Sequence, residues 1–368
     1  MHSRRILVVG QTPPPYGGQA VMIERLLQGS YKNAKLFHVR MAFAKDMDDM
    51  GRFRPGKLLH LLSLIAQIVR GRFLDGADIL YFPPSGPDLG PLLRDLAILV
   101  PTRWLFRKTI FHFHAAGTSE IFSRLPIWLK PFYWLGYGRP DLGIRLSEFN
   151  PNDPEFLNAN RSVIVPNGIE DDFSEEVDFS QEGTATVNVL FVGLLTESKG
   201  VFVLVEAAHL LKQRGVRVSV TMVGKFASED VRTRLAALVE SYGLSDDVEF
   251  TGVLTGEAKF RRFYSADIFC FPTFFESESF GLVVAEGMQF KLPVVVSRWR
   301  GVQSVVRDGE TGYLVPPHDA TAVADCLQIL VEDPGLRLRM GERGREVFLN
   351  EYTLPRFQQR MDECFRDL

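Results

Sequence analysis

The chain has 368 residues, of which 46% are hydrophobic and 24% are charged, and this composition excludes a disordered, collagen-like or disulfide-stapled protein. Its length favours two domains, because a single hydrophobic core rarely grows beyond about 250–300 residues. Its three scattered cysteines, Cys270, Cys326 and Cys364, are too few for a disulfide framework or a metal cluster and indicate a reducing compartment.

The net charge of −3 is divided unevenly along the chain. Residues 1–168 contain 21 basic and 13 acidic side chains, a balance of +8, whereas the remaining residues contain 21 basic and 32 acidic ones, a balance of −11. We therefore expect the basic half to face an anionic partner. Nucleic acid is not expected, because the basic residues are dispersed and no helix-turn-helix, zinc-finger or RNP pattern accompanies them. An anionic membrane surface or a phosphorylated acceptor fits better.

No segment has the length and composition of a signal peptide or of a membrane span. Only residues 6–9 separate the basic pair Arg4-Arg5 from Gly10, and the longest apolar stretch, residues 58–69, is about half of what a bilayer requires. We expect a cytoplasmic protein that is at most peripheral at the inner face of the membrane.

Short apolar segments alternate with stretches of helical spacing throughout the chain. In the first half, strands are expected at residues 5–10, 79–82, 109–114, 142–145 and 162–165, with helices that include 19–27 and 57–69. In the second half, strands are expected at 187–192, 216–223, 248–250, 268–271 and 293–297, with helices at 201–214, 230–242, 257–265 and 279–290. Strands rich in Val, Ile, Leu and Phe that are linked by helices predict parallel sheets covered on both faces.

The expected fold class is therefore α/β, with two doubly wound, Rossmann-like domains. Residues 1–168 form the N-terminal domain and residues 187–350 the C-terminal domain, while residues 169–186 are acidic and small and are interpreted as a solvated linker. Ligands of such sheets bind at the carboxyl ends of the strands. The expected active site is the cleft between the two domains.

Two features of the N-terminal domain favour an anionic or polar ligand. Gly17 and Gly18 lie at the start of a predicted helix, where backbone N–H groups can approach an anion closely; a plain strand-to-helix turn is the alternative. Alternation along residues 109–114 places His112 and His114 on one face of a strand. His114, at the carboxyl end, is the candidate functional residue, and His112 is interpreted as a core residue.

The C-terminal domain contains the stronger pattern. Lys199 precedes Gly200 at a helix start, a position that is unfavourable for a cation unless an anion binds there; a solvated lysine is the alternative. Glu278 and Glu286 lie eight residues apart after the predicted strand at 268–271. Glu278 directly precedes the helix predicted at 279–290, and Glu286 lies within it. A carboxylate within an apolar helix is costly unless it is hydrogen-bonded, and a vicinal diol would satisfy it.

At these residues the sequence resembles a known family, the retaining GT4-type glycosyltransferases of GT-B fold. Glu278 to Glu286 is similar to the family's E-x7-E signature. Further similar segments are the N-terminal phosphate loop at Gly17-Gly18, the interdomain PNG segment at 165–169, the donor diphosphate motif at Gly193 with Lys199-Gly200, and the segments 293–297 and 308–316. The resemblance is dense from residue 189 to residue 317 and sparse before it.

The resemblance implies a role for each matching residue. Glu286 would bind the ribose hydroxyls of a nucleotide sugar, Glu278 and the following N–H groups would hold the donor sugar, and Lys199 would hold the diphosphate. The complete set that it implies is His114 and Glu278 as catalytic residues, with Gly17, Gly18, Gly193, Lys199, Val253, Ser279, Phe280, Gly281, Leu282, Glu286, Arg298 and Arg300 as donor-binding residues.

The chain departs from the family pattern at three positions. Leu194 stands where the family usually has an arginine that binds the diphosphate, and Arg298 and Arg300 are the candidates to supply that charge. Arg300 itself stands where the family usually has glycine, and Ser304 replaces a frequent glutamate.

No metal or other cofactor is expected. The residues Asp46-Met47-Asp48 form a DxD sequence, but they lie in a charged segment without helical or strand periodicity. Stabilisation of the leaving group then falls to Lys199, to helix termini and to arginines.

An aromatic and basic segment of the N-terminal domain has two interpretations. Residues 125–135, together with Trp104, Arg107, Arg124 and Arg139, have the mixed apolar and cationic character of an interfacial membrane anchor. The alternative is an ordinary helix packed on the sheet.

The expected function is the transfer, with retention, of a hexose-type sugar from a nucleotide-diphosphate sugar to a saccharide or lipid-linked acceptor in polysaccharide or glycolipid biosynthesis. Family resemblance favours a UDP-sugar, and it implies that residues 351–368 form a helix that packs back on the N-terminal domain. The alternatives are a nucleotide-sugar epimerase or phosphorylase on the same fold, and a catalytically degenerate binding protein, which Leu194 suggests.

Overall fold

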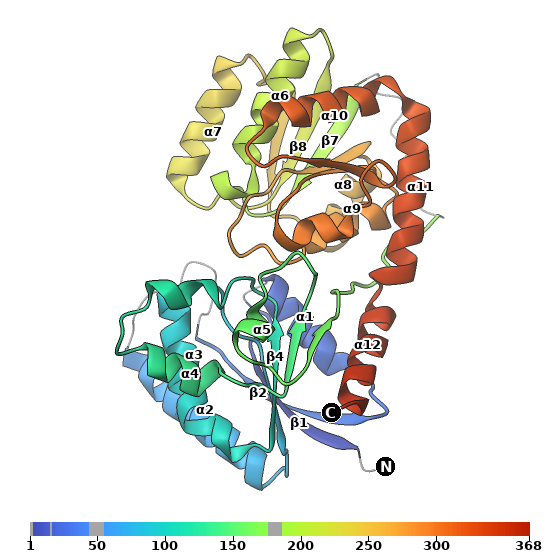
Figure 1. Cartoon of the computed structure of the whole chain (residues 1–368). Coiled ribbons are helices and arrows are strands. Elements are labelled where there is room, and N and C mark those ends of the chain that lie inside the picture. Colours follow the sequence, from blue (N-terminus) through green and yellow to red (C-terminus); the bar gives the residue numbers. More distant parts are fainter. Residues whose placement is uncertain (1–2, 15–16, 44–54, 176–185) are drawn as a thin grey trace. The chain divides into compact units, whose positions relative to one another are not determined.

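The computed structural model describes residues 3–14, 17–43, 55–175 and 186–368. The chain divides into two compact units, one made of Met1–Gly168 with Leu354–Leu368 and the other of Ile169–Thr353. Each unit is built on a six-stranded parallel sheet flanked by helices (Figure 1). The predicted α/β class with two doubly wound sheets is confirmed.

The sheet of the N-terminal unit has the order β2-β1-β3-β4-β5-β6. Its strands are β1 (Arg4–Gly10), β2 (Ala34–Arg40), β3 (Ile79–Phe82), β4 (Lys108–Phe113), β5 (Leu142–Arg145) and β6 (Ser162–Ile164). Its helices are α1 (Gly18–Gln28), α2 (Pro55–Phe73), α3 (Leu89–Thr102), α4 (Lys130–Tyr137), α5 (Asp153–Phe156) and α12 (Leu354–Arg366). The sequence analysis missed β2, because this edge strand is only partly buried and its polar residues interrupt the apolar run.

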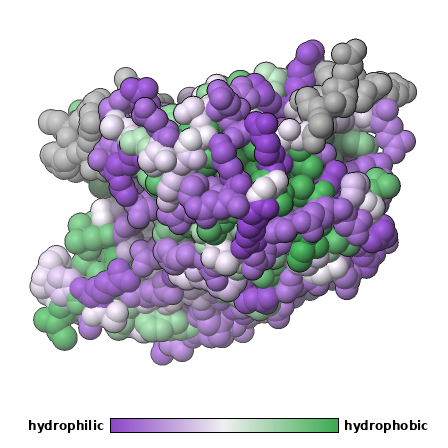
Figure 2. Space-filling model, turned by 90° about the horizontal axis from the view of Figure 1, so that it is seen from above, coloured by the Kyte–Doolittle hydropathy of each residue, from purple (hydrophilic) through white to green (hydrophobic). Residues whose placement is uncertain are grey.

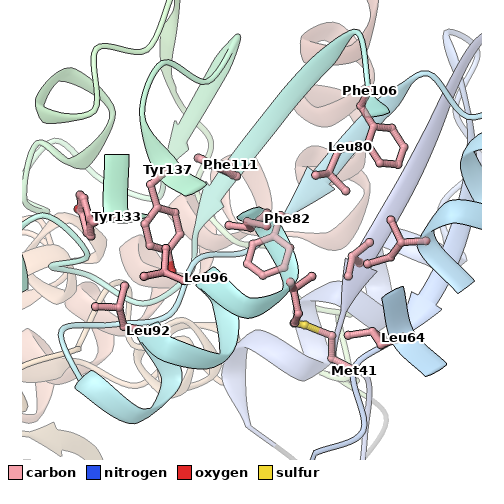
Figure 3. Close-up of a cluster of buried hydrophobic side chains, with 14 of the residues drawn as sticks. Met41, Leu64, Leu80, Phe82, Leu92, Leu96, Phe106, Phe111, Tyr133 and Tyr137 are labelled. Atoms are coloured by element: carbon pink, nitrogen blue, oxygen red, sulfur yellow. The ribbon is translucent and has the colours of Figure 1, made fainter. Parts of the chain in front are cut away.

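The core of this unit is formed by aromatic and aliphatic side chains between the sheet and its helices. Figure 3 shows Phe82 and Phe111 of the sheet beside Tyr137 of α4 and Leu96 of α3. The Tyr137 hydroxyl donates to Oδ2 of Asp95 at 2.9 Å, and Asp95 is fully buried. Its carboxylate also accepts from the Ser85 backbone N–H and from the side chain of Arg94, so this buried charge is fully hydrogen-bonded.

The sheet of the C-terminal unit has the order β12-β11-β10-β7-β8-β9. Its strands are β7 (Val187–Val192), β8 (Val218–Val223), β9 (Val248–Gly252), β10 (Ile268–Phe271), β11 (Val294–Ser297) and β12 (Gly312–Val315). Its helices are α6 (Val201–Gln213), α7 (Glu229–Ser241), α8 (Gly256–Tyr264), α9 (Leu282–Gln289), α10 (Ala320–Glu332) and α11 (Pro334–Glu351). The strand order reverses between β7 and β10, and such a switch point opens a crevice at the carboxyl ends of the strands.

The segment that follows residue 168 differs from the solvated linker expected at 169–186. Its described part, residues 169–175, packs on the C-terminal unit: the Ile169 backbone N–H donates to the Tyr352 carbonyl, and Phe173 stacks on the ring of Tyr264 at 5.6 Å. The carboxylate of Asp171 accepts hydrogen bonds from both terminal nitrogens of Arg345 at 2.6 and 2.7 Å. The expectation is wrong for these residues, because their partners lie far away in sequence; residues 176–185 lie outside the described residues.

The end of the chain returns to the N-terminal unit, as the family resemblance implied. The returning segment is α12, which begins at Leu354 rather than at residue 351, because α11 continues to Glu351. The Asp362 carboxylate accepts from the backbone and side-chain nitrogens of Asn33 at 2.9 and 3.0 Å. Phe365 packs its ring edge-on against Tyr31.

Among the described residues, no helix combines the length and the apolar character that crossing a membrane requires. The face shown in Figure 2 is mostly hydrophilic, with hydrophobic residues in small groups.

Candidate active site

The candidate site of the C-terminal unit lies where β7 and β10 end. Gly193 directly follows β7, and its backbone N–H donates to the carbonyl of Val223, the last residue of β8. The loop after β7 leads through Lys199 to α6, and the loop after β10 leads through Glu278 to α9. The two motifs, which are about 80 residues apart in sequence, thus emerge from neighbouring strands.

Lys199 and Glu278 form an ion pair at this point. The ammonium Nζ lies 2.5 Å from Oε2 of the carboxylate, and the two side chains keep only 18% and 11% of their surface exposed. The ammonium also lies 4.5 Å from the centre of the Phe275 ring, a cation–π contact. The sequence analysis assigned the two residues to the same ligand, and the structure brings them into direct contact.

Gly200 allows the two loops to approach this closely. It adopts the left-handed conformation with φ of 84° at the start of α6. A Cβ atom placed there would lie 2.1 Å from the carbonyl oxygen of Pro272, at the end of β10. Only glycine fits at this crossing of backbones.

Two residues that the sequence analysis missed hold the loop of Glu278. The buried Thr273 hydroxyl lies 3.3 Å from the Ser198 carbonyl and 3.5 Å from Oε2 of Glu278, and it accepts from the Phe275 backbone N–H. The indole of Trp299 donates to the Phe275 carbonyl at 2.9 Å. Thr273 follows a predicted strand directly, and that position is the signal by which it could have been found.

The second carboxylate of the pair, Glu286, lies on α9 and meets another lysine. Lys259 of α8 places its ammonium 2.7 Å from Oε1 of Glu286. The other oxygen, Oε2, is buried and has no hydrogen-bond partner among the described residues. The sequence analysis predicted a buried carboxylate in need of donors but missed Lys259, which shares the buried face of its helix with Phe263.

The remaining predicted donor-binding residues lie around these pairs. Helix α9 begins at Leu282, three residues later than expected, so Ser279, Phe280 and Gly281 form the turn before it. Phe280 is buried, and its ring packs edge-on against Tyr352. Val253 is exposed directly after β9.

The two candidate arginines differ in their surroundings. Arg298 is more than half exposed and its guanidinium is held by Asp308 at 2.9 Å. Arg300 is half-buried with a positive φ of 39°, a conformation that is strained for a residue other than glycine. Leu194, which takes the place of the family's arginine, is exposed. Arg298 must therefore leave Asp308 to reach another anion.

The N-terminal unit contributes the two histidines predicted to share one face of β4. Their rings lie 3.9 Å apart, which confirms the alternation. The Tyr81 hydroxyl lies 2.6 Å from Nδ1 of His112 and 3.5 Å from Nε2 of His114. Burial lowers the pKa of His114 to about 3, and burial together with His114 lowers the pKa of His112 well below its ordinary value. Both rings are therefore neutral at pH 7, and His114 offers a hydrogen bond rather than a charge.

Gly17 and Gly18 lie at the start of α1, as predicted. Gly17 is the N-cap residue with an extended backbone, and a Cβ atom added to it would meet nothing within 4 Å. The described fold therefore does not itself require a glycine at position 17. Arg40 of β2, which the sequence analysis missed, donates to the carbonyls of Thr12, Pro13 and Pro14 in the preceding loop.

The aromatic and basic segment fits neither interpretation alone. Tyr133 and Tyr137 of α4 are buried in the core, as the helix-packing alternative requires. In contrast, Trp104, Ile127 and Trp128 are 65%, 83% and 64% exposed. A groove of about 330 Å³ runs between α3 and the segment that leads into the first turn of α4, and the residues that line it are Leu93, Leu96, Ala97, Val100, Pro101, Trp128, Leu129 and Phe132.

The described residues contain no group of three or more His, Cys, Asp or Glu side chains that could hold a metal ion. The DxD sequence Asp46-Met47-Asp48 lies outside the described residues. The expectation that no metal ion binds therefore stays a prediction.

Residues 172–347 match the family model described as Glycosyl transferases group 1. The phosphatidyl-myo-inositol mannosyltransferase of Mycobacterium leprae is 34% identical over 188 residues, which are 50% of this chain and 48% of that protein. The D-inositol 3-phosphate glycosyltransferase of Arthrobacter sp. is 36% identical over 166 residues, 44% of this chain and 38% of that protein. The matches thus span half or less of these relatives.

Solved structures resemble the chain over its whole length. The Anabaena protein Alr3699/HepE in complex with UDP has a TM-score of 0.77 at 18% identity, covering 99% of this chain and 100% of that one. A glycosyltransferase from Rickettsia africae has a TM-score of 0.75 at 19% identity, covering 100% and 99%. At such identities the likeness shows the fold, and it confirms the predicted GT-B architecture of two Rossmann-like domains.

Proposed function

Since residues 172–347 match the model of the family described as Glycosyl transferases group 1, we propose that the protein is a retaining hexosyltransferase that uses a nucleotide-diphosphate sugar as its donor. The observation that carries the proposal is the pair of carboxylates Glu278 and Glu286 at the switch point of the C-terminal sheet, each within 2.7 Å of a lysine ammonium. Cations there suit a diphosphate, and carboxylates suit the hydroxyls of ribose and sugar. The chemistry of the site and the family match agree.

In this proposal each group has one task. Lys199 leaves Glu278 to bind the diphosphate and to stabilise the charge of the departing nucleotide, while Glu278 holds the hydroxyls of the donor sugar. Glu286 binds the ribose, and the N–H groups of the turn before α9 add donors at a helix start. Arg300 supplies the second cation in place of the family's arginine. His114 contacts the sugar as a neutral hydrogen-bonding group.

The donor nucleotide that we favour is UDP. Two structures similar in fold contain UDP and UDP-glucose, respectively. The acceptor that we favour is an anionic saccharide or a lipid-linked one, as in polysaccharide or glycolipid biosynthesis. The names of two relatives specify a phosphoinositide lipid and an inositol phosphate, and the +8 balance of residues 1–168 suits such an acceptor.

The proposal includes no metal cofactor, because it assigns the charge of the leaving diphosphate to Lys199, Arg300 and the helix starts. The test is a thermal-shift screen of the protein with UDP, GDP, UDP-glucose and GDP-mannose. A ligand at 100 times its Kd stabilises by about 2.7 kcal/mol. We expect UDP and a UDP-sugar to stabilise the protein, and sugar transfer to continue in EDTA. The anomeric configuration of the product, read by NMR, then tests retention.

Two other functions are separated by their products. A degenerate binding protein, which the exposed Leu194 favours, would bind the donor but neither transfer nor hydrolyse its sugar. An epimerase or phosphorylase would convert the donor without any acceptor. Absence of binding to every nucleotide in the screen would refute all three.

We further propose that the exposed aromatic surface of the N-terminal unit, made of Trp104, Ile127, Trp128 and Phe132, docks on an anionic membrane. Residues 89–139, which contain this surface, have seven Lys and Arg against two Asp and Glu. Indole rings and cations beside an apolar groove match the interface of an anionic bilayer. Such docking would bring a peripheral enzyme to a lipid-linked acceptor.

The test is flotation with vesicles that contain anionic lipid and with vesicles of neutral lipid alone. We expect binding to anionic vesicles at low salt, and a loss of about tenfold or more when Trp104 and Trp128 are both replaced by alanine. Leu338→Ala, at an equally exposed apolar position of α11, is the matched control and should bind like the wild type. Equal binding of the double variant and the wild type would remove this part of the proposal.

A further inference from the structure

Lys259 is a cation of the C-terminal unit to which neither the E-x7-E motif nor its neighbouring loops assign a role. It lies on α8, four residues before Phe263, whose ring is fully buried. Residues four apart share one face of a helix. Its ammonium is 5.8 Å from the centre of that ring, and only 20% of its side chain is exposed. Lysine is among the residue types most rarely covered, so a partner must explain its position.

That partner is Glu286 of α9, and its two carboxylate oxygens have different surroundings. Oε1 accepts a hydrogen bond from the Lys259 ammonium at 2.7 Å. Oε2 is buried and has no hydrogen-bond partner among the residues that the structure describes. A buried carboxylate oxygen without a donor is destabilising, and a hydroxyl of a ligand removes that cost. The Glu286 side chain as a whole is 21% exposed, so a ligand can contact the carboxylate, and it reaches Oε2 once the atoms that cover this oxygen move aside.

We propose that Lys259 is a positioning residue for recognition of the nucleotide ribose. By bonding to Oε1 it fixes the orientation of the Glu286 carboxylate and leaves Oε2 for a ribose hydroxyl. Its charge also balances a carboxylate that would otherwise repel an anionic nucleotide. The inference rests on the proposed function, in which Glu286 binds ribose, and it requires no contact between Lys259 and the nucleotide.

A positioning role and a merely structural role differ in what they change. If the ion pair only holds α8 against α9, breaking it lowers the stability of the unit and weakens the binding of all nucleotides by the same factor. A lysine that orients Glu286 sets the discrimination between ribose and deoxyribose. The ratio of the two affinities is therefore the decisive readout.

The experiment measures the Kd of UDP, 2′-deoxy-UDP and 3′-deoxy-UDP by titration calorimetry for the wild type and four variants. Lys259→Met keeps the length of the stem and removes the charge, Lys259→Arg keeps the charge, and Glu286→Gln marks the loss of the carboxylate. Arg261→Met is the matched control, because Arg261 lies on the same helix and pairs with the exposed Glu257. Melting temperatures are recorded for each, and Lys259→Gln replaces the Met variant if that variant does not fold.

We expect the wild type to prefer UDP over at least one deoxy analogue by about tenfold or more, since a hydrogen bond to a charged group contributes about 1.5–3 kcal/mol. Lys259→Met should lose most of this preference, Lys259→Arg should keep most of it, and Arg261→Met should match the wild type. A preference in Lys259→Met equal to or greater than that of the wild type overturns the inference while the proposed function stands. A wild type that binds no nucleoside diphosphate refutes both.

Discussion

Replacement of Glu278 by glutamine is expected to weaken the fold while strengthening the binding of UDP. At 2.5 Å and an effective dielectric constant of about 20, the attraction between Lys199 and Glu278 is about 7 kcal/mol before desolvation. Removing one partner of a buried pair costs about 3–5 kcal/mol. Both side chains retain a little exposure and glutamine remains an acceptor, so we expect a loss of about 2–3 kcal/mol. For a unit of this size (residues 169–353) that is a fall in melting temperature of roughly 5–10 °C.

The effect on ligand binding has the opposite sign. In the wild type the diphosphate must draw Lys199 away from Glu278, and the carboxylate repels it. In Glu278→Gln the ammonium is free to bind the diphosphate, so UDP should bind roughly three- to tenfold more tightly, where tenfold is about 1.4 kcal/mol. Sugar transfer should fall by about 100-fold or more, because the group that holds the donor sugar is lost.

The assays are differential scanning calorimetry with and without UDP, titration calorimetry with UDP, and transfer from the UDP-sugar. Glu276→Gln is the matched control: it removes the same charge two residues away at an exposed position, where a charged interaction contributes no more than about 1 kcal/mol. A melting temperature of Glu278→Gln equal to that of the wild type, or weaker binding of UDP by this variant than by the wild type, would contradict the prediction.

Two further predictions concern pH and backbone packing. Burial lowers the pKa of His114 to about 3 and also lowers the pKa of His112, so both rings are neutral in the folded protein. In the unfolded chain both rings take up a proton below about pH 6.5. The free energy of unfolding is therefore at its full value above pH 6.5 and falls below it by about 1.4 kcal/mol per pH unit for each ring. Urea midpoints of the N-terminal unit should therefore fall between pH 6.5 and 5. His114→Gln should remove part of that slope, because burial also lowers the pKa of His112, His38 and His60; a flat profile would contradict the burial argument. Gly200→Ala, whose Cβ would lie 2.1 Å from the Pro272 carbonyl oxygen, should cost at least about 3 kcal/mol in denaturant unfolding, whereas Gly215→Ala, with a similar φ of 79° and open space around it, should cost about 1–2 kcal/mol. Equal costs would mean that the two loops do not meet at Gly200.

Most strands could be predicted from the sequence, because strands buried on both faces consist of nearly continuous apolar runs. β7 and β10 are the clearest cases, and their observed bounds match the prediction. β2 escaped prediction because it lies at the sheet edge, where every polar side chain has access to solvent. The prediction for the described part of the segment after residue 168 was wrong, because the local sequence does not show the partners of Asp171 and Phe173. These partners lie on α11 and α8, which are distant in sequence.

The candidate site was predicted unevenly. The spacing of Glu278 and Glu286 is a local pattern and was visible in the sequence, as was the glycine before α6. Thr273, Trp299 and Lys259 were missed, because their importance comes only from atoms that they touch. A lysine on a helix is normally a solvated surface residue, and nothing in the sequence around Lys259 shows that it meets a carboxylate 27 residues away.

The sequence by itself determined the α/β class, the approximate boundary at residue 168 and the two carboxylates of the site, because periodicity and short-range spacing are properties of the chain as written. Only the tertiary structure decided the pairing of those carboxylates with Lys199 and Lys259, and the burial that keeps His114 neutral. Ion pairs and pKa shifts depend on distance and on the removal of water, and both arise when strands that are distant in sequence become neighbours in a sheet. For that reason the sequence identified Lys199, Glu278 and Glu286, whereas the ion pairs that these residues form, and the part of Lys259 in them, were visible only in the folded chain.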